Sequence, residues 1–262
     1  MDYSTSVEKA TLLNDFFAKQ CSIVAPPCAL PPLRAVTQSR LHKIDTNSDD
    51  VRKFLLGLDV GKASGPDGIS TRLLKNISDS VCHQLSDLYN FSLSTGEFPS
   101  LWKQANVTPI YKKGDNQNKA NYRPVSLISV VGKVLERIVF THMYEYCSTN
   151  GLLTWRNSGF KPFDSAMNQL VMLTHKIYQN FDQHTDVCMV FMDVAKAFDK
   201  VWHTGLVHKL QTLGFESSIL KWLTNYLSNR AQKVVIQGQQ SPLMDIEAGV
   251  PQGSILGPLL FI

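Results

Sequence analysis

The sequence lacks any long apolar run. No stretch approaches the roughly 20 apolar residues that a membrane-spanning helix needs, and the first residues, MDYSTSVEKATLLNDFF, show no uninterrupted apolar segment behind a basic start. Neither a membrane span nor a secretory signal peptide is therefore expected. Internal repeats and low-complexity tracts are missing as well. We predict a soluble, intracellular protein without a membrane partner, whose 44% hydrophobic content is sufficient for a real core.

Cysteine is sparse and scattered. The five cysteines are odd in number, and no two of them have the close spacing of a zinc knuckle or a redox motif. This pattern predicts reduced, mostly buried thiols.

A large surplus of one charge is also lacking. The chain has 26 basic and 22 acidic residues, and its net charge of +4 is compatible with nucleic acid without indicating it. The basic residues are concentrated, however. Residues 103–137 contain seven basic and two acidic residues, which is a local surplus of five. This stretch is the candidate nucleic-acid-binding surface.

Helical patterns dominate the first hundred residues. Thr5 and Glu8 fit a capping box, and Ala10, Leu13 and Phe17 then recur on one face of a short helix. A proline-rich linker, a loop with a Pro-Asp-Gly turn and two more helices are expected to follow. The linker lies at residues 25–32, the loop at 61–68, and the helices at 48 onward (Val51, Phe54, Leu55) and 78–94 (Val81, Leu85, Leu88).

Strand patterns appear only after residue 100. They comprise two short β-branched segments, an apolar run expected to be a strand buried on both faces, and a hairpin around Gly238. These strands lie at residues 107–111, 123–128, 186–194, 233–237 and 241–248. Further helices are expected through Val134, Leu135 and Ile138, at 203–213 and at 217–229. Helices first, and strands mixed with helices later, indicate an α+β fold.

Asp193 stands at the end of the apolar run 186–194. A carboxylate at the end of a buried strand is costly to keep charged unless a cation compensates it. Mg²⁺ is a natural compensation, because carboxylate oxygens are hard ligands that suit this ion. The simpler alternative is an aspartate that caps the following loop or pairs with Lys196, and the residue alone leaves both interpretations open.

The surroundings of Asp193 favour the metal. Phe198 follows it by five residues, and a Pro-Gln-Gly turn follows Val250. Seven segments occur in order: GKASGPDG, TPIYKKGD, NYRPVSL, GKVLERIV, SGFKPFDSAMNQL, VFMDVAKAFDKVWH and GVPQGSILGPLLF. In this order they closely resemble the reverse transcriptases of non-LTR (LINE-type) retrotransposons, of the Jockey and CR1 sort. The resemblance extends from about Leu12 to the last residue.

The resemblance implies the fingers and partial palm of a right-hand polymerase within the α+β fold. A helical N-terminal extension with its linker (residues 1–45) would precede the reverse transcriptase domain (residues 46–262). The implied function is that of a mobile element's RNA-directed DNA polymerase, which adds dNTPs to a DNA primer on an RNA template by two-metal chemistry with Mg²⁺. A nuclear location is implied as well.

The resemblance also assigns roles to residues of the palm. Asp193 corresponds to the first catalytic carboxylate and, with the carbonyl of Val194, to a ligand of Mg²⁺. Phe198 corresponds to the aromatic gate that excludes a ribose 2′-OH, with a plain core position as its alternative. Gln252 and Gly253 lie in the turn that contacts the incoming nucleotide and the template, and Gly253 leaves room for close backbone approach. A Pro-Gln-Gly tripeptide alone would be an ordinary turn.

Further roles are implied around this centre. Lys112, Lys113 and Arg123 lie on an expected finger hairpin, where cations can hold a triphosphate, Arg123 by a bidentate fork. Their alternative is a solvated surface. Asp199 is expected to fix the loop beside the site. Residues 61–68 match a segment associated with template handling, and an ordinary linker is the alternative there.

Two departures from the family pattern stand out. The family usually has Arg where Lys161 stands, Gly near Phe163 and Thr near Ala166, and a bulky Phe163 is expected to distort a turn. In the family, a hairpin with two aspartates follows shortly after the position of Ile262 and completes the metal site. This sequence ends before that hairpin, so we expect the chain by itself to be inactive.

Two other functions stay open at this point. An RNA-dependent RNA polymerase is loosely similar in having Asp193 with Asp199, but Phe198 and the Pro-Gln-Gly turn speak against it, because such an enzyme needs a polar group for the 2′-OH. A non-catalytic nucleic-acid-binding remnant would use residues 103–137. Steeply salt-dependent RNA binding without incorporation would distinguish the remnant from a polymerase.

Overall fold

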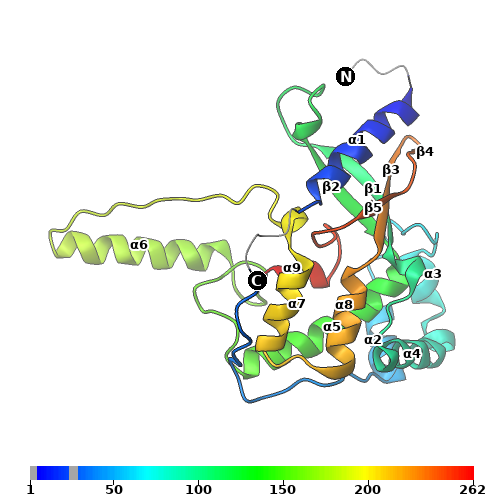
Figure 1. The fold of residues 1–262 in the computed structure, drawn as a ribbon, viewed down its shortest axis with the longest axis horizontal. Helices are drawn as coiled ribbons and strands as arrows, with labels where there is room; N and C mark the ends of the chain where they lie inside the picture. Colours follow the sequence, from blue (N-terminus) through cyan, green and yellow to red (C-terminus); the bar gives the residue numbers. More distant parts are fainter. Residues whose placement is uncertain (1–4, 24–28) are drawn as a thin grey trace.

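The computed structural model describes residues 5–23 and 29–262 of the chain. A small five-stranded sheet lies at one end of a larger group of helices, and one helix extends away from both (Figure 1). This arrangement confirms the prediction of a chain with mixed helices and strands. Most of the predicted linker at residues 25–32 lies outside the described residues.

The sheet is built around β1. This strand is antiparallel to β2 and parallel to β3, and β3 also pairs antiparallel with β4 and β5. The strands are β1 (Gln104–Tyr111), β2 (Tyr122–Ile128), β3 (Arg230–Ile236), β4 (Gln239–Gln240) and β5 (Met244–Ile246). The predicted hairpins are confirmed, because β1 and β2 are consecutive antiparallel strands and β3 is followed by its antiparallel partners β4 and β5.

Alternation along β2 decides which side chains face the core. Tyr122, Ser126 and Ile128 are buried, whereas Arg123 between them is exposed. A strand turns successive side chains to opposite faces, so a basic residue can stand on the outer face of a strand whose inner face is packed.

Helix α1 (Ser6–Gln20) packs on this sheet. The Thr5 hydroxyl accepts a hydrogen bond from the Glu8 N–H at 3.2 Å, which confirms the predicted cap. Apolar side chains of α1 form a small core with those of β1, β2 and β3; its members are Ala10, Leu13, Phe17, Val107, Tyr122 and Val234. Asn14 on the same face accepts from Gln232 Nε2 at 3.1 Å and donates to the Pro242 carbonyl at 2.9 Å. These contacts fasten the N-terminal helix to the sheet.

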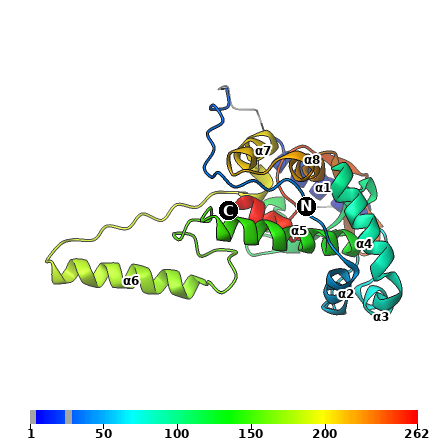
Figure 2. The same cartoon turned by 90° about the horizontal axis from the view of Figure 1, so that it is seen from below.

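The main core surrounds α5 (Val130–Thr149), whose Leu135, Ile138 and Val139 are almost fully buried. Helices from both halves of the chain cover it (Figure 2). They are α2 (Ser48–Leu56), α3 (Thr71–Asn76), α4 (Ser78–Thr95), α7 (His203–Thr212), α8 (Ser217–Leu227) and α9 (Leu256–Phe261). Single 3-10 turns precede β1 and β2 and lie at η1 (Ser100–Lys103) and η2 (Lys119–Asn121). None of the described helices is long and apolar enough to cross a membrane.

The predicted apolar face of α4 is rotated in the structure. Leu88 is exposed, whereas Ser86 and Tyr89 are buried. Both buried hydroxyls have partners, because Ser86 donates to the Thr46 carbonyl at 3.3 Å and Tyr89 to the Val131 carbonyl at 2.9 Å. A buried polar group is tolerated when it is hydrogen-bonded. The pattern of apolar residues alone could not indicate that these two hydroxyl-bearing residues face the core.

The prediction of a buried strand at residues 186–194 is wrong. This run has an extended backbone without strand pairing, and Val190, Phe191 and Met192 are between 78% and 90% exposed. Together with α6 (Ala166–Asp182) it forms an arm that lies apart from the body in both views (Figures 1 and 2). A buried strand needs neighbours at its edges and faces, and none of the described strands supplies them. The length of an apolar run alone was therefore not enough to predict the structure of this segment.

The turn before α6 contains one of the departures from the family pattern. Phe163 has φ of 62° and a fully exposed side chain. This left-handed backbone region favours glycine, which is the residue that the resemblance expects at this position. The chain therefore holds a strained residue where a glycine would be relaxed.

Replacing Phe163 with glycine should therefore strengthen the turn. Relief of left-handed strain is worth about 1–2 kcal/mol and outweighs the entropy cost of glycine, about 0.5–1 kcal/mol. We expect slower cleavage of residues 154–165 in limited proteolysis. Phe160→Gly is the matched control: φ is 59° there, but the ring contacts Phe198 at 5.6 Å between centroids. Faster cleavage of Phe163→Gly than of the parent would contradict the strain.

Candidate functional site

The Pro-Gln-Gly turn is held between two other parts of the chain. On one side, the Gly249 N–H donates to the Val201 carbonyl and the Val250 N–H donates to the Phe198 carbonyl, both at 2.9 Å. On the other side, the Gln252 carbonyl accepts from the Ser126 N–H of β2 at 2.8 Å. The turn thus joins β2 to η3 (Phe198–Lys200), two segments far apart in the sequence.

Two glycines make this close seating possible. Gly253 has φ of 139°, and a Cβ there would stand 2.3 Å from the Ser126 carbonyl oxygen. Gly249 has φ of 87°, and a Cβ there would stand 2.8 Å from the Phe198 carbonyl oxygen. The sequence predicts that Gly253 allows close backbone approach to a substrate. The close neighbour that the structure shows is the backbone of β2.

The Gln252 side chain connects three of these segments. Its Nε2 donates to Asp199 Oδ1 at 2.7 Å, and its Oε1 accepts from Arg123 Nε at 3.3 Å. Asp199 is only 5% exposed, and its second oxygen has no hydrogen-bond partner in the described part of the chain. The buried aspartate therefore fixes the amide of Gln252, in agreement with the expectation that Asp199 shapes the loop.

The predicted lysines lie at the far end of the β1–β2 hairpin. Arg123 pairs with Ile110 across the hairpin, and Lys112 and Lys113 follow at its exposed tip. The Lys112 N–H donates to the Asn121 carbonyl at 2.9 Å, which holds the backbone at the tip. The structure thus brings Arg123 to the Gln252 side chain and leaves both lysines further along the same hairpin.

The ring of Phe198 belongs to an aromatic cluster. It stacks on Phe261 with centroids 4.8 Å apart and planes 17° apart, and it meets Phe160 edge-on at 5.6 Å. The ring is half-buried rather than enclosed. Phe198 belongs to the same η3 turn as Asp199, and its carbonyl accepts from the Val250 N–H just before the Pro-Gln-Gly turn.

Asp193 and Val194 are not drawn into this group. Both are exposed on the extended arm, and no hydrogen bond or ion pair joins Asp193 to another described side chain. The described residues contain no group of three or more His, Cys, Asp or Glu side chains that could hold a metal ion. Two Mg²⁺ ions need several carboxylate ligands, so these residues do not by themselves form the implied metal centre.

Glu136 lies within the GKVLERIV segment, where no sequence signal indicated a role for it. Its side chain is fully buried in α5, and Oε2 accepts from the N–H groups of Ile255 at 2.6 Å and Leu256 at 3.2 Å. Burial raises the pKa of the Glu136 carboxyl above its usual range, while nearby Arg230 and the two N–H groups act in the opposite direction. Only the buried environment, which a sequence motif does not show, identifies this group.

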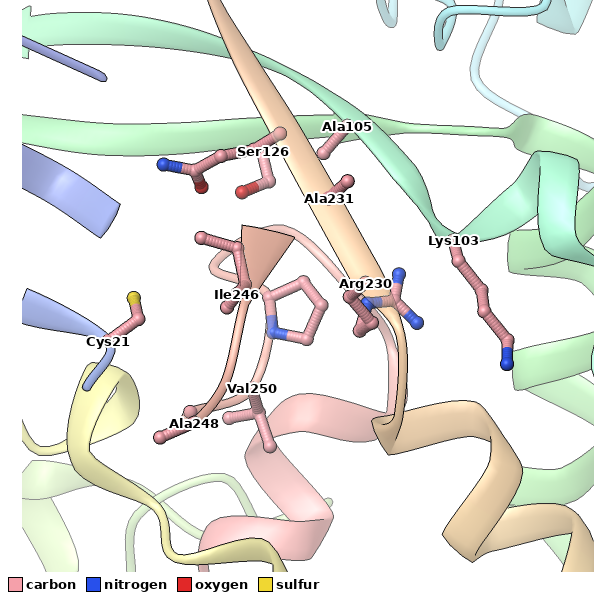
Figure 3. A pocket seen from close by; sticks show the side chains of 12 residues that line it. Cys21, Lys103, Ala105, Ser126, Arg230, Ala231, Ile246, Ala248 and Val250 are labelled. Carbon is pink, nitrogen blue, oxygen red and sulfur yellow. The ribbon is translucent and has the colours of Figure 1, made fainter. Parts of the chain in front are cut away.

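A small cavity of about 40 Å³ lies beneath the turn (Figure 3). Cys21, Ile246, Val250 and Arg230 are among its lining residues. Burial, and then the charge of Asp199, raise the pKa of the Cys21 thiol to about 12, so the thiol stays protonated at neutral pH. The cavity has room for water-sized molecules only and is not a nucleotide pocket.

Comparison with known proteins decides what this site belongs to. Residues 110–262 match the family described as reverse transcriptase (RNA-dependent DNA polymerase). The probable RNA-directed DNA polymerase from transposon BS of Drosophila melanogaster is 33% identical over 214 residues, covering 81% of this chain and 24% of that protein. The chain belongs to the reverse transcriptase family.

Other similar proteins also come from mobile or retrotransposable elements. The RNA-directed DNA polymerase from mobile element jockey of Drosophila melanogaster is 29% identical over 81% of this chain and 23% of its own length. The Pol polyprotein from type-1 retrotransposable element R2 of Popillia japonica is 29% identical over 64% of this chain and 23% of its own length. The predicted LINE-type resemblance is confirmed. The main interpretation is thereby supported over an RNA-dependent RNA polymerase and over a non-catalytic remnant. The chain spans about a quarter of the length of these relatives.

The reverse transcriptase domain should lose stability when Gly253 becomes alanine. A Cβ cannot fit beside the Ser126 carbonyl, and the cost should be about 1–3 kcal/mol. Gly238→Ala is the matched control, because its φ is 79° but nothing lies within 4 Å of the added atom. That control should cost only about 1 kcal/mol. Urea unfolding followed by tryptophan fluorescence measures both, and equal costs would show that the close approach to β2 has no energetic weight.

The buried carboxyl of Glu136 should make stability depend on pH. Its pKa is raised in the folded state, so its contribution is fully present below the ordinary value of 4.5 and is lost as pH rises through the folded pKa. Glu136→Gln cannot ionise. The parent should therefore lose stability relative to this variant as pH increases above 4.5, measured by urea unfolding. Glu145→Gln, at an exposed position of α5, is the matched control. A difference between parent and Glu136→Gln that stays constant with pH would contradict this assignment.

Proposed function

We propose that this chain is the part of an RNA-directed DNA polymerase that receives the incoming dNTP beside an RNA template and a DNA primer. The observation that supports it is the hydrogen-bonded series from Arg123 through Gln252 to Asp199. It joins a basic hairpin to the Pro-Gln-Gly turn and to the segment of Phe198, which are the three places where the family handles the nucleotide.

The geometry suits the binding of a triphosphate at Arg123. This exposed side chain uses Nε to contact Gln252, and its two Nη groups make no hydrogen bond to the described part of the chain. A guanidinium can therefore present a fork to phosphate oxygens. Lys112 and Lys113 at the hairpin tip would add positive charge, which agrees with the hairpin serving as fingers.

Gln252 and Phe198 would act on the rest of the nucleotide. Asp199 holds the Gln252 amide in one orientation, so the turn is prepared to contact base or template before a substrate arrives. The Phe198 ring is supported by Phe261 and Phe160. A ring supported in this way cannot easily swing aside, which is what steric exclusion of a 2′-OH requires. These residues would then lie in the palm.

A divalent metal is general in this family, and Asp193 with the Val194 carbonyl are the ligands we propose. When bound, the metal would activate the primer hydroxyl and neutralise charge on the leaving pyrophosphate. The described residues do not complete such a site, so we propose these two groups as ligands and not as the whole metal centre. We propose the nucleus as the location, as expected for such an element.

The basic hairpin can be tested by charge removal. Replacing Lys112, Lys113 and Arg123 with alanine should weaken binding to a fluorescein-labelled RNA–DNA hybrid. The dependence of log affinity on log salt should flatten by up to about three units, one for each phosphate that the variant no longer neutralises. Fluorescence anisotropy between 50 and 200 mM salt, about the range over which such contacts respond, provides the measurement.

A second triple variant serves as the control. Arg34, Lys53 and Lys209 are exposed residues outside the hairpin, and their replacement removes the same charge. The control should keep the salt dependence of the parent. Equal effects of both triple variants would mean that only net charge attracts the hybrid and that the hairpin is a solvated surface.

A further inference from the structure

The segment that follows the Pro-Gln-Gly turn enters the core directly. Helix α9 begins at Leu256, and Ile255 offers no side-chain cap, while the Ser254 hydroxyl accepts from the Gly257 N–H at 3.0 Å. A helix start leaves backbone N–H groups without partners, and burying them unpaired is costly. Both of the first N–H groups, those of Ile255 and Leu256, instead donate to Glu136 of α5. The acceptor thus comes from α5, the helix at the centre of the main core, more than a hundred residues earlier in the sequence.

The surroundings of Glu136 hold its carboxylate in place. Among the groups that lower the pKa of Glu136, Arg230 of β3 has the largest effect, and this residue is itself only 4% exposed. It lies over the Tyr226 ring at 4.9 Å, and its Nη1 donates to the Tyr226 carbonyl at 2.9 Å. Because Glu136 is fully buried and its Oε2 accepts two N–H groups of the other segment, the carboxyl group is confined between α5 and the start of α9.

We propose that Glu136 is a positioning residue for Gln252. The turn is attached at its first end to Val201 and Phe198, in its middle to Ser126, and at its second end to Glu136. Removal of the last attachment would free residues 253–256 to move away from β2, and the Gln252 amide would leave the line between Arg123 and Asp199. This inference rests on the proposed function for its consequence in nucleotide binding, but the positioning itself is a property of the folded chain.

Residue-resolved hydrogen exchange of the intact chain tests the positioning without any substrate. Glu136→Leu has similar volume and no acceptor, whereas Glu136→Gln keeps one acceptor oxygen. In the leucine variant we expect exchange about tenfold faster or more at Ile255 and Leu256, the size expected for loss of a hydrogen bond to a charged group. The decisive reporters are Ser126, Gly249 and Val250, whose N–H groups hold the turn but do not touch Glu136. They should accelerate as well, and glutamine should restore them.

Asn47→Ala is the matched control for general loss of stability. Asn47 caps α2 through the Asp50 N–H at 2.9 Å and lies in another part of the helical body. It should accelerate exchange in α2 and leave the three turn reporters as in the parent. Acceleration confined to Ile255 and Leu256 in Glu136→Leu would reduce Glu136 to a local cap and overturn the proposal. Acceleration of every amide, as in a globally unstable protein, would overturn it too if glutamine failed to restore the turn.

Nucleotide binding provides a separate result. Affinity for dTTP on a poly(rA)–oligo(dT) hybrid should fall about tenfold in Glu136→Leu, and Glu136→Leu should add little in a Gln252→Ala background. If the turn loosens in hydrogen exchange while dTTP binding of the parent is undetectable, the proposed function fails and the positioning stands. If dTTP binds and depends on Gln252 but not on Glu136, the positioning role fails and the proposed function stands.

Discussion

The seating of the Pro-Gln-Gly turn against β2 is the contact on which the arrangement of the site depends. Gly253 allows the backbone to approach the Ser126 carbonyl, and Gly249 allows the same turn to approach Phe198 and Asp199. Without both approaches, Arg123 and Asp199 could not reach the two ends of one glutamine side chain. Residues from distant parts of the chain therefore converge because two positions in the turn have no Cβ.

The two hydrophobic cores of the molecule support the segments that meet at this contact. The smaller core joins α1 to the sheet, while the larger core surrounds α5 and supports α9. The turn lies where they meet, since Gln252 contacts a strand covered by α1 and the residues after it are bound to α5. Lys200 beside Asp199 also donates to the Ser22 carbonyl at 2.8 Å, just after α1. The N-terminal helix is thus linked both to the sheet and to the segment that carries Asp199. The division of the chain near residue 45 stays a prediction.

Local signals allowed much of the fold to be predicted. The Thr5 cap, the glycine-rich loop at 61–68 and the β-branched strands near Val107 depend on neighbouring residues, and the structure agrees with them. The candidate site was predictable in part: the motifs named Arg123, Phe198, Gln252 and Gly253, and the structure brings these four around one turn, while their roles stay predictions. Glu136 could not be assigned, because its role depends on burial and on a partner 119 residues away. Asp193 was expected on a buried strand, but an apolar sequence cannot supply its own neighbouring strands.

The exposed arm has a consequence for how this chain behaves in solution. Residues 186–194 combine high β-propensity with an extended backbone whose hydrogen-bonding groups are not used in any described sheet. Such a segment can pair edge to edge with the same segment of another molecule, which is the first step of aggregation. Asp186 and Asp193 stand at or near its two ends. Charges at the flanks of an apolar stretch oppose stacking of like chains, so these two carboxylates would counter such pairing whatever chemistry Asp193 serves.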